Sequence, residues 1–203
     1  MRSEYTDVNI IRACMAQMQP HNALAMETVL QTGLRIDDVL SIRTDNITGR
    51  TLCITEMKTG KTARKVLSAK LCKDLKSNAV DGWCFPSRCG ALAQHRTRQA
   101  VYTDLRKCAE ALGVQAHLSP HSGRKVYAVD MYRTQGFKAV KEALNHDNEA
   151  VTLLYALSDK LSESHTDNTD LINAIAERVR EIVRFELQRI EKLILLSKYT
   201  DEP

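Results

Sequence analysis

The sequence predicts a mainly α-helical domain with a small antiparallel β-sheet, which is an α+β fold. Apolar residues recur every three or four positions along most of the 203 residues, as expected for helices with one buried face. Between Asn46 and Ser68 this spacing gives way to short apolar stretches on either side of the tetrapeptide Lys58-Thr59-Gly60-Lys61, a pattern typical of a β-hairpin. Hydrophobic residues make up 43% of the chain and charged residues 27%, which favours a globular domain with its own core.

The first part of the chain is predicted to form three helices. A helix from Asp7 to Gln19 carries apolar residues on one face and ends before Pro20. Asn22 is expected to cap a second helix, which Gly33 closes because glycine readily adopts a positive φ. A third helix is expected to begin near Arg35.

Helical spacing returns after the hairpin, near Ala69, and again from Ala93 to Leu112. Ser119 followed by Pro120 predicts the start of a further helix, because serine caps helices and proline suits their first position. Gly136 is expected to end that helix.

The C-terminal part is predicted to contain two short helices, at residues 137–144 and 149–157, and then a polar stretch. The expected organisation is therefore a domain over residues 1–159, a polar linker over 160–170 and an amphipathic helix within 171–203. That last helix could contact a neighbouring protomer or pack on its own domain.

Composition narrows the classes of protein. The net charge of +4 and the pI near 8.7 permit a nucleic-acid partner without requiring one. The chain has neither an apolar stretch long enough for a bilayer nor an N-terminal secretion signal, so we expect a cytoplasmic protein. The six cysteines form no C-x-x-C pair and are expected to be reduced thiols, and His117 with His121 lacks a third metal ligand.

Three motifs carry the residue types that phosphoryl transfer needs: a nucleophile, a proton donor and fixed positive charge. They are TGLRIDDVLSI, SPHSGRK and LNHDNEAVTLLY, and the hairpin sequence MKTGK lies between the first two. The candidate residues in them are Arg35, Lys58, His121, Arg124, His146 and Tyr155. Each motif alone is weak evidence, but together, in this order, they resemble the signature of the tyrosine recombinase (phage integrase) family over roughly residues 7–159.

The resemblance implies the catalytic-domain fold of that family and a role for each charged residue. Arg35 and Arg124 would clamp the scissile phosphate, because a guanidinium stays charged and binds phosphate oxygens in pairs. Asp38 stands where the family has an acid after the first arginine. Lys58 would protonate the departing 5′ oxygen, with Lys61 as its rival in the same turn.

The resemblance further implies that Tyr155 attacks the phosphate and forms a 3′-phosphotyrosyl bond. His121 would act as a base or positioner, and His146 would donate a hydrogen bond to the phosphate. Asn145 replaces the family's usual glycine, and Lys125 stands where many members carry a histidine; no role is predicted for either.

The expected function is therefore site-specific recombination or integration on double-stranded DNA, without metal, ATP or other cofactor. A homotetramer on DNA, a location at the nucleoid and an origin in a bacterium, phage or mobile element are part of this expectation. Two alternatives stay open: a nicking and closing activity like that of type IB topoisomerases, and a DNA-binding regulator of the same fold without catalysis. Members of the family often carry a further N-terminal DNA-clasping domain, so we also expect either a fragment or a short recombinase.

Overall fold

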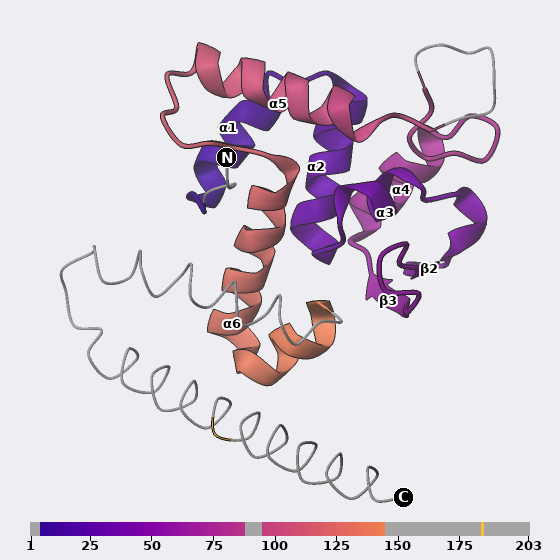
Figure 1. Cartoon of the computed structure of the whole chain (residues 1–203). Coiled ribbons are helices and arrows are strands. Elements are labelled where there is room, and N and C mark those ends of the chain that lie inside the picture. The colour runs from indigo at the N-terminus through magenta and orange to yellow at the C-terminus, as the bar shows by residue number, and fades with distance from the viewer. Residues whose placement is uncertain (1–4, 88–94, 145–183, 185–203) are drawn as a thin grey trace, which may run out of the picture. The chain divides into compact units, whose positions relative to one another are not determined.

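The computed structural model describes residues 5–87, residues 95–144 and the single residue Arg184. Contacts divide the chain into residues 1–153 and 154–203, and every element named below belongs to the first part (Figure 1). The predicted helix at 149–157, the linker at 160–170 and the segment 171–203 lie outside the described residues, apart from Arg184. The elements in chain order are α1 (Val8–Met15), α2 (Pro20–Thr32), α3 (Ile36–Leu40), a 3₁₀ turn η1 (Thr44–Asn46), β1 (Ile47–Thr48), β2 (Thr51–Thr55), β3 (Thr62–Val66), α4 (Ala69–Ser77), α5 (Arg98–Ala111) and α6 (Pro120–Leu144).

Both of the first two predicted helices form, but the first ends at Met15 instead of Gln19, and the start of the second differs. Helix α1 begins after Asp7, whose carboxylate accepts the N–H of Asn9 at 2.7 Å. Helix α2 begins at Pro20 itself, so the prediction that Asn22 caps it was wrong. Proline has no N–H to satisfy and has the φ angle of a helix, so it suits the first position of a helix as well as the end of the preceding one.

Asn22 is buried within α2 and connects it to α5 and to the segment just before α5. Its amide nitrogen donates to the Asp104 carboxylate at 2.6 Å, and its amide oxygen accepts from Arg96 at 3.0 Å. Asp104 also accepts the N–H of Gln19 at 2.9 Å. The side chain of Asn22 therefore satisfies partners far away in the sequence instead of its own helix terminus.

Gly33 closes α2 as predicted, and its lack of a side chain also serves packing. Its φ of +68° allows its N–H to bond the Val29 carbonyl at 2.9 Å. A Cβ atom at this position would lie 2.2 Å from the ring of Tyr127 on α6. Glycine is therefore required both by the turn and by the close approach of α6.

The predicted hairpin forms β2 and β3 of an antiparallel sheet in the order β1-β2-β3. Leu52 pairs with Lys65 and Ile54 pairs with Ala63. Gly60, with a φ of +66°, lies in the connecting turn, whose ends are held by the Glu56 N–H bonding the Lys61 carbonyl at 2.9 Å. The change from helical to alternating spacing along the sequence is thus confirmed.

Helix α5 begins at Arg98, five residues later than the predicted start at Ala93. The Thr97 hydroxyl caps it by accepting the N–H of Ala100 at 3.2 Å. Residue 93 itself lies outside the described residues. Two residues before the helix, Arg96 donates its N–H to the Phe85 carbonyl at 2.7 Å. This backbone pairing holds the chain extended just before Thr97, where apolar spacing alone had suggested a helix.

Helix α6 starts at Pro120, with the Ser119 hydroxyl accepting the N–H of His121 at 3.2 Å, as predicted. The chain bends at Gly136, whose φ of 79° and ψ of −179° are not helical. The predicted pair of helices on either side of Gly136 is therefore confirmed as two segments joined by a kink.

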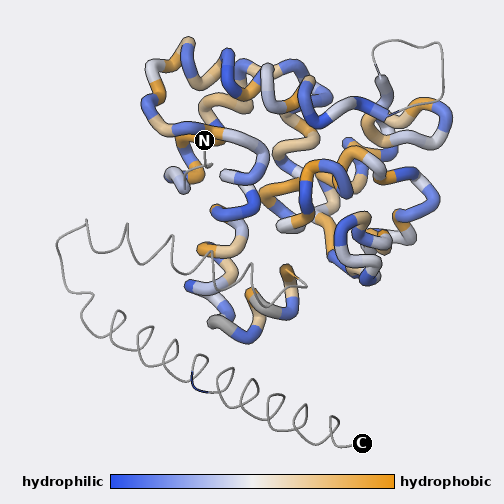
Figure 2. The backbone as a smooth tube through the Cα atoms, in the orientation of Figure 1, coloured by the Kyte–Doolittle hydropathy of each residue, from blue (hydrophilic) through white to orange (hydrophobic). Residues whose placement is uncertain are grey.

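One large cluster of buried apolar side chains forms the core, and a small second cluster lies on α6. Figure 2 shows apolar and polar residues alternating along the helices, as expected where one face of each is buried. Within the residues that the structure describes, no helix is both long enough and apolar enough to cross a membrane. The largest fully buried side chains are Phe85, Ile11, Met26, Leu34, Leu40, Ile42, Leu52, Leu67, Leu71, Leu75, Leu105 and Leu118.

Candidate functional site

Arg124 is buried in the first turns of α6 and bonds backbone from two distant segments. Only 2% of its surface is exposed. One guanidinium nitrogen, Nη1, donates to the Gly33 carbonyl, and the other, Nη2, donates to the Leu144 carbonyl at 3.2 Å. Gly33 lies two residues before Arg35 in the TGLR motif. The structure therefore brings the two predicted arginine motifs into direct contact across 91 positions of sequence.

Arg35 stands immediately before α3 and is held by a buried carboxylate at the end of β2. Its Nη1 atom lies 2.7 Å from Oε2 of Glu56, whose side chain is 1% exposed, while 13% of the Arg35 side chain is exposed. Removing Arg35 would take this cationic partner away from a buried carboxylate, which is costly. The pair fixes the guanidinium beside the hairpin that carries Lys58.

Asp38, the acid after the first arginine, connects α3 to the hairpin. Its Oδ1 atom accepts the N–H of Met57 at 2.8 Å, and its Oδ2 atom is buried with no hydrogen-bond partner among the described residues. Burial raises the pKa of the Asp38 carboxyl, and the nearby charge of Glu56 raises it further. The Met57 N–H, Arg35 and Arg124 act in the opposite direction. Asp38 thus ties the backbone next to Lys58 to the arginine site.

Lys58 and Lys61 both lie in the turn between β2 and β3, and both side chains are exposed. Neither position is favoured over the other by burial, so Lys58 remains the predicted proton donor and Lys61 its rival. The turn itself is ordered at its base, because the Thr59 hydroxyl donates to Glu56 at 3.3 Å and Gly60 donates its N–H to the Glu56 carbonyl at 2.9 Å.

His121 lies in the first turn of α6, three residues before Arg124, and is exposed. Side chains three residues apart in a helix lie on the same face, so His121 is on the Arg124 side of the helix, nearer to solvent. Predicted site residues His146 and Tyr155 lie outside the described residues. Four of the six predicted residues are therefore described, and of these Arg35 and Arg124 are joined most directly, through the TGLR segment.

Lys65 on β3 is a feature of the site that the sequence pattern did not single out. Its Nζ atom donates to the carbonyl of Ala143, near the end of α6, at 2.7 Å, and lies 5.4 Å from the ring centre of Tyr127. Burial lowers the pKa of Lys65 to about 8, and the positive charge of Arg124 lowers it as well, against the effect of Glu56. It is not the solvated hairpin lysine that its basic neighbours suggest.

Lys65→Met is expected to change how stability depends on pH. The pKa of Lys65, about 8 in the folded protein, lies below its ordinary value of 10.5, so the unfolded chain binds more protons between these values. The free energy of unfolding of the unmodified protein should therefore rise relative to that of Lys65→Met from about pH 8 upward, by about 1–3 kcal/mol in all. Urea unfolding of both proteins between about pH 7 and about pH 10 measures this difference. A difference that stays constant over that range would contradict it.

Glu56 and Lys65 are the two residues whose part in the site was missed. The signal for Lys65 was present in the strand pattern, because Ala63 and Lys65 lie on the same face of β3 and pair with the buried residues Ile54 and Leu52. A lysine at an inward-facing strand position breaks the expected alternation of apolar and polar residues. No comparable local signal identified Glu56, because a carboxylate at the end of a strand is common at protein surfaces.

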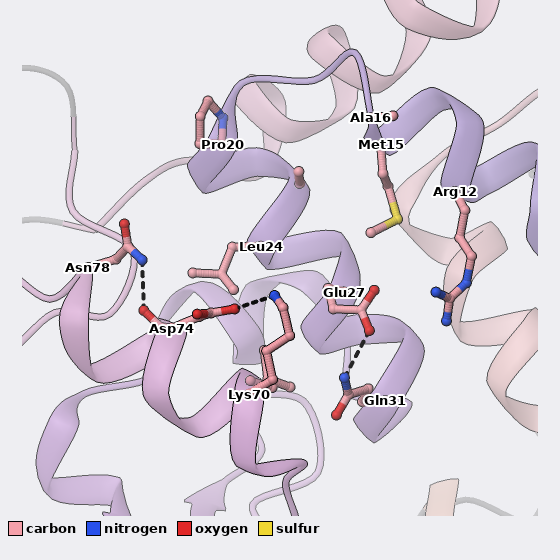
Figure 3. Close-up of a pocket in the computed structure, with 12 residues that line it drawn as sticks. Arg12, Met15, Ala16, Pro20, Leu24, Glu27, Gln31, Lys70, Asp74 and Asn78 are labelled. Atoms are coloured by element: carbon pink, nitrogen blue, oxygen red, sulfur yellow. Dashed lines mark hydrogen bonds and ion pairs between the residues drawn. The ribbon is translucent and has the colours of Figure 1, made fainter.

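One described cavity lies apart from these residues. It measures about 510 Å³ and is lined by residues of α1, α2 and α4, including Arg12, Leu24 and an ion pair between Lys70 and Asp74 at 2.7 Å (Figure 3). None of the six predicted site residues lines it. In residues 5–87 and 95–144, no group of three or more His, Cys, Asp or Glu side chains is placed to hold a metal ion.

The sequence of this chain is similar to a known protein family and to two of its members. The sequence model described as "Phage integrase family" matches residues 5–161. The chain is 28% identical over 144 residues to the tyrosine recombinase XerC of Actinobacillus pleuropneumoniae serotype 7 (strain AP76), covering 66% of this chain and 46% of XerC. It is 27% identical over 149 residues to XerC of Vibrio atlanticus (strain LGP32), with the same coverage. The chain thus spans about half the length of these relatives.

Solved structures with the same fold include a lambda integrase dimer bound to a COC′ core site, with a TM-score of 0.63 and 17% identity. The match covers 75% of this chain and 48% of that one. The XerH site-specific recombinase, in a post-cleavage complex with a palindromic difH substrate, matches with a TM-score of 0.60 and 17% identity over 79% of this chain and 52% of that one. The family match extends over more than half of the sequence and includes the contact between the two arginine motifs, so this chain belongs to the phage integrase family.

Proposed function

We propose that this chain is the catalytic part of a site-specific recombinase or integrase that cleaves and rejoins double-stranded DNA through a covalent bond to Tyr155. The observation that carries the proposal is the bond from Arg124 to the Gly33 carbonyl. It brings Arg124 beside the segment that ends in Arg35, so that two permanent positive charges belong to one site. Two such guanidinium groups can bind the oxygens of a phosphate diester and stabilise the negative charge that develops on them during attack at phosphorus.

The chemistry assigned to the site is an exchange of one phosphodiester bond for another. The Tyr155 oxygen forms a bond to phosphorus, and the bond from phosphorus to the 5′ oxygen breaks, leaving a 3′-phosphotyrosyl linkage and a free 5′ hydroxyl. Lys58 gives the departing oxygen its proton, while His121 takes or directs the tyrosine proton. Attack by a 5′ hydroxyl reverses these steps. The number of phosphodiester-type bonds is unchanged, so the scheme requires neither ATP nor a cofactor.

Arg35 and Arg124 have distinct supports in this scheme. Arg35 is held by Glu56, so its orientation depends on the end of β2 and therefore on the hairpin that carries Lys58. Arg124 is held by the carbonyls of Gly33 and Leu144, and two residues after Leu144 comes His146. We infer that His146 donates a further hydrogen bond to the phosphate.

The proposed partner is double-stranded DNA, and the proposed assembly is a homotetramer formed on DNA. The lambda integrase and XerH structures that share this fold were solved with DNA sites, which supports DNA as the partner. We further propose a catalytic domain at residues 1–159, a linker at 160–170 and a segment at 171–203 that contacts a neighbouring protomer. Recombination between two sites would need such contacts between protomers.

The proposal is tested with nicked duplexes that trap the covalent state. The chain is incubated with a pool of duplexes that carry a randomised central sequence and a nick. After cleavage, the short fragment between the cleavage point and the nick, which carries the free 5′ hydroxyl, diffuses away. We expect adducts that survive denaturing electrophoresis, and sequencing of the DNA recovered from them would identify the preferred site. The adduct should form in the presence of a metal chelator.

Other results, in this experiment or in plasmid assays, would contradict part of the proposal. Binding to the duplexes without any adduct would favour the silent DNA-binding regulator. Relaxation of supercoiled plasmid without recombination between two copies of the selected site would favour an activity like that of type IB topoisomerases. An adduct that forms only with added metal ion would remove the cofactor-free scheme.

A further inference from the structure

The end of α6 is attached to the rest of the described structure by polar contacts more than by the main core. Leu144 packs with Ala128 and Val140 in a small cluster that is separate from the main hydrophobic core. Two cations reach the last carbonyls of the helix: Lys65 bonds that of Ala143, and Arg124 bonds that of Leu144. Positive charge at a helix carboxyl terminus is favourable, because the carbonyls there carry partial negative charge.

Lys65 occupies a strand position that would ordinarily be apolar. It pairs with Leu52, which is fully buried, and shares its strand face with Ala63, which is 3% exposed. Burial and the nearby charge of Arg124 both disfavour the ammonium form here, as the lowered pKa of Lys65 shows. An apolar side chain of similar size would fill this strand position without the cost of burying a charge. The lysine therefore serves a purpose other than packing.

Lys65 donates to a backbone carbonyl near the end of α6, and two hollows adjoin it. Hollows of about 390 Å³ and about 350 Å³ are lined by residues of both β3 and α6, and Lys65 and Tyr127 line both of them. The charged side chains that influence Lys65 or line these hollows with it are Arg124, Glu56, Arg64, Asp130 and Glu142. The hollows leave β3 and this part of α6 incompletely packed against each other, so the bond from Lys65 to Ala143 is a direct connection between them.

We propose that Lys65 is a positioning residue of the DNA strand-transfer site, which holds the end of α6 against β3 and thereby orients Arg124. The inference rests on the proposed function. Lys65 donates to the Ala143 carbonyl, and the adjacent Leu144 carbonyl accepts a hydrogen bond from Nη2 of Arg124. The β-hairpin that contains Lys65 also carries Lys58. Lys65 thus sets the placement of the proton donor's hairpin relative to a phosphate-binding arginine, without itself touching the reacting atoms.

The test compares Lys65→Met, which keeps the length and apolar stem, with Lys65→Arg, which keeps the charge and a donor. Lys107→Met, at an exposed position on α5, is the matched control for removing a lysine charge. On the selected nicked duplex, at saturating protein, Lys65→Met should form adduct about 10- to 100-fold more slowly, as expected when a catalytic group is misplaced. DNA affinity should be nearly unchanged, Lys65→Arg should recover most of the rate, and Lys107→Met should behave as the unmodified chain.

Hydrogen exchange gives a readout that does not depend on activity. Amides at the end of α6, within residues 137–144, should exchange faster in Lys65→Met than in the unmodified chain, while those of α5 should not change. Should Lys65→Met fail to fold, Lys65→Gln, which also removes the charge, replaces it. Exchange of the same amides should be faster in that variant as well.

A bridging sulfur at the 5′ position separates positioning from proton donation. Sulfur should accelerate Lys65→Met no more than it accelerates the unmodified chain; a selective rescue would make Lys65 the proton donor and overturn the proposal. Unchanged adduct formation and unchanged exchange in Lys65→Met would also overturn it. If the unmodified chain forms no adduct on any duplex, the proposed function fails, whereas the exchange experiment still decides whether Lys65 holds the end of α6.

Discussion

Tyr155→Phe is expected to bind the selected duplex as the unmodified chain does and to form no covalent adduct. Only the phenolic oxygen is removed, so the proposed nucleophile is lost while the aromatic ring is kept. The rate of strand cleavage should fall by at least about 10⁴-fold, the scale seen when the attacking group of an enzyme is deleted. Denaturing electrophoresis after incubation with the nicked duplex measures the adduct directly.

The matched control for Tyr155→Phe is Tyr132→Phe. Tyr132 lies on α6 and packs against the small cluster of Ala128, Val140 and Leu144, so the same chemical change there removes a hydroxyl without removing the proposed nucleophile. Tyr132→Phe should give a normal yield of adduct. If Tyr155→Phe still forms the adduct, the nucleophile is another residue, and mapping the DNA-linked peptide would identify it.

Lys58→Ala is expected to cleave ordinary DNA about 10²- to 10⁴-fold more slowly, because a 5′ alkoxide leaves poorly without a positioned proton donor. Replacing the bridging 5′ oxygen by sulfur should restore most of the rate. A thiolate needs no proton in order to leave, since the pKa of a thiol is only about 8.5. Single-turnover cleavage of both substrates by the unmodified chain and by Lys58→Ala provides the measurement.

Two further variants make the result for Lys58 specific. Arg35→Ala should be slow on both substrates, because its defect concerns charge on the phosphate and not the leaving group. Lys61 is exposed in the same turn as Lys58, so Lys61→Ala is the closest control. Selective rescue of Lys61→Ala by sulfur, in place of Lys58→Ala, would transfer the proton-donor role to Lys61.

Much of the fold could be predicted because its signals are local. The start of α6 at Pro120, the closure of α2 at Gly33 and the hairpin turn at Gly60 each depend on a few adjacent residues. The bend at Gly136 is of the same kind. Capping and turn chemistry act over three or four positions, so the printed sequence contains nearly all the information that decides them.

The errors arose where a distant partner decided the local structure. Asn22 has the chemistry of a helix cap, but its side chain bonds Asp104 and Arg96 from a buried position inside α2. The helix predicted from Ala93 begins at Arg98, because the backbone of Arg96 pairs with that of Phe85. In both cases a contact between segments far apart in sequence outweighed a weak local preference.

The sequence by itself determined which residue types are available for catalysis and in which order they occur. Arg35 and Arg124 were identifiable from their motifs, as was the hairpin that carries Lys58. Only the tertiary structure decided which groups hold them: Gly33 and Leu144 for Arg124, Glu56 for Arg35, and Lys65 for the end of α6. The physical reason is that a buried charge is stable only beside partners that folding brings from elsewhere in the chain, and no local pattern specifies those partners.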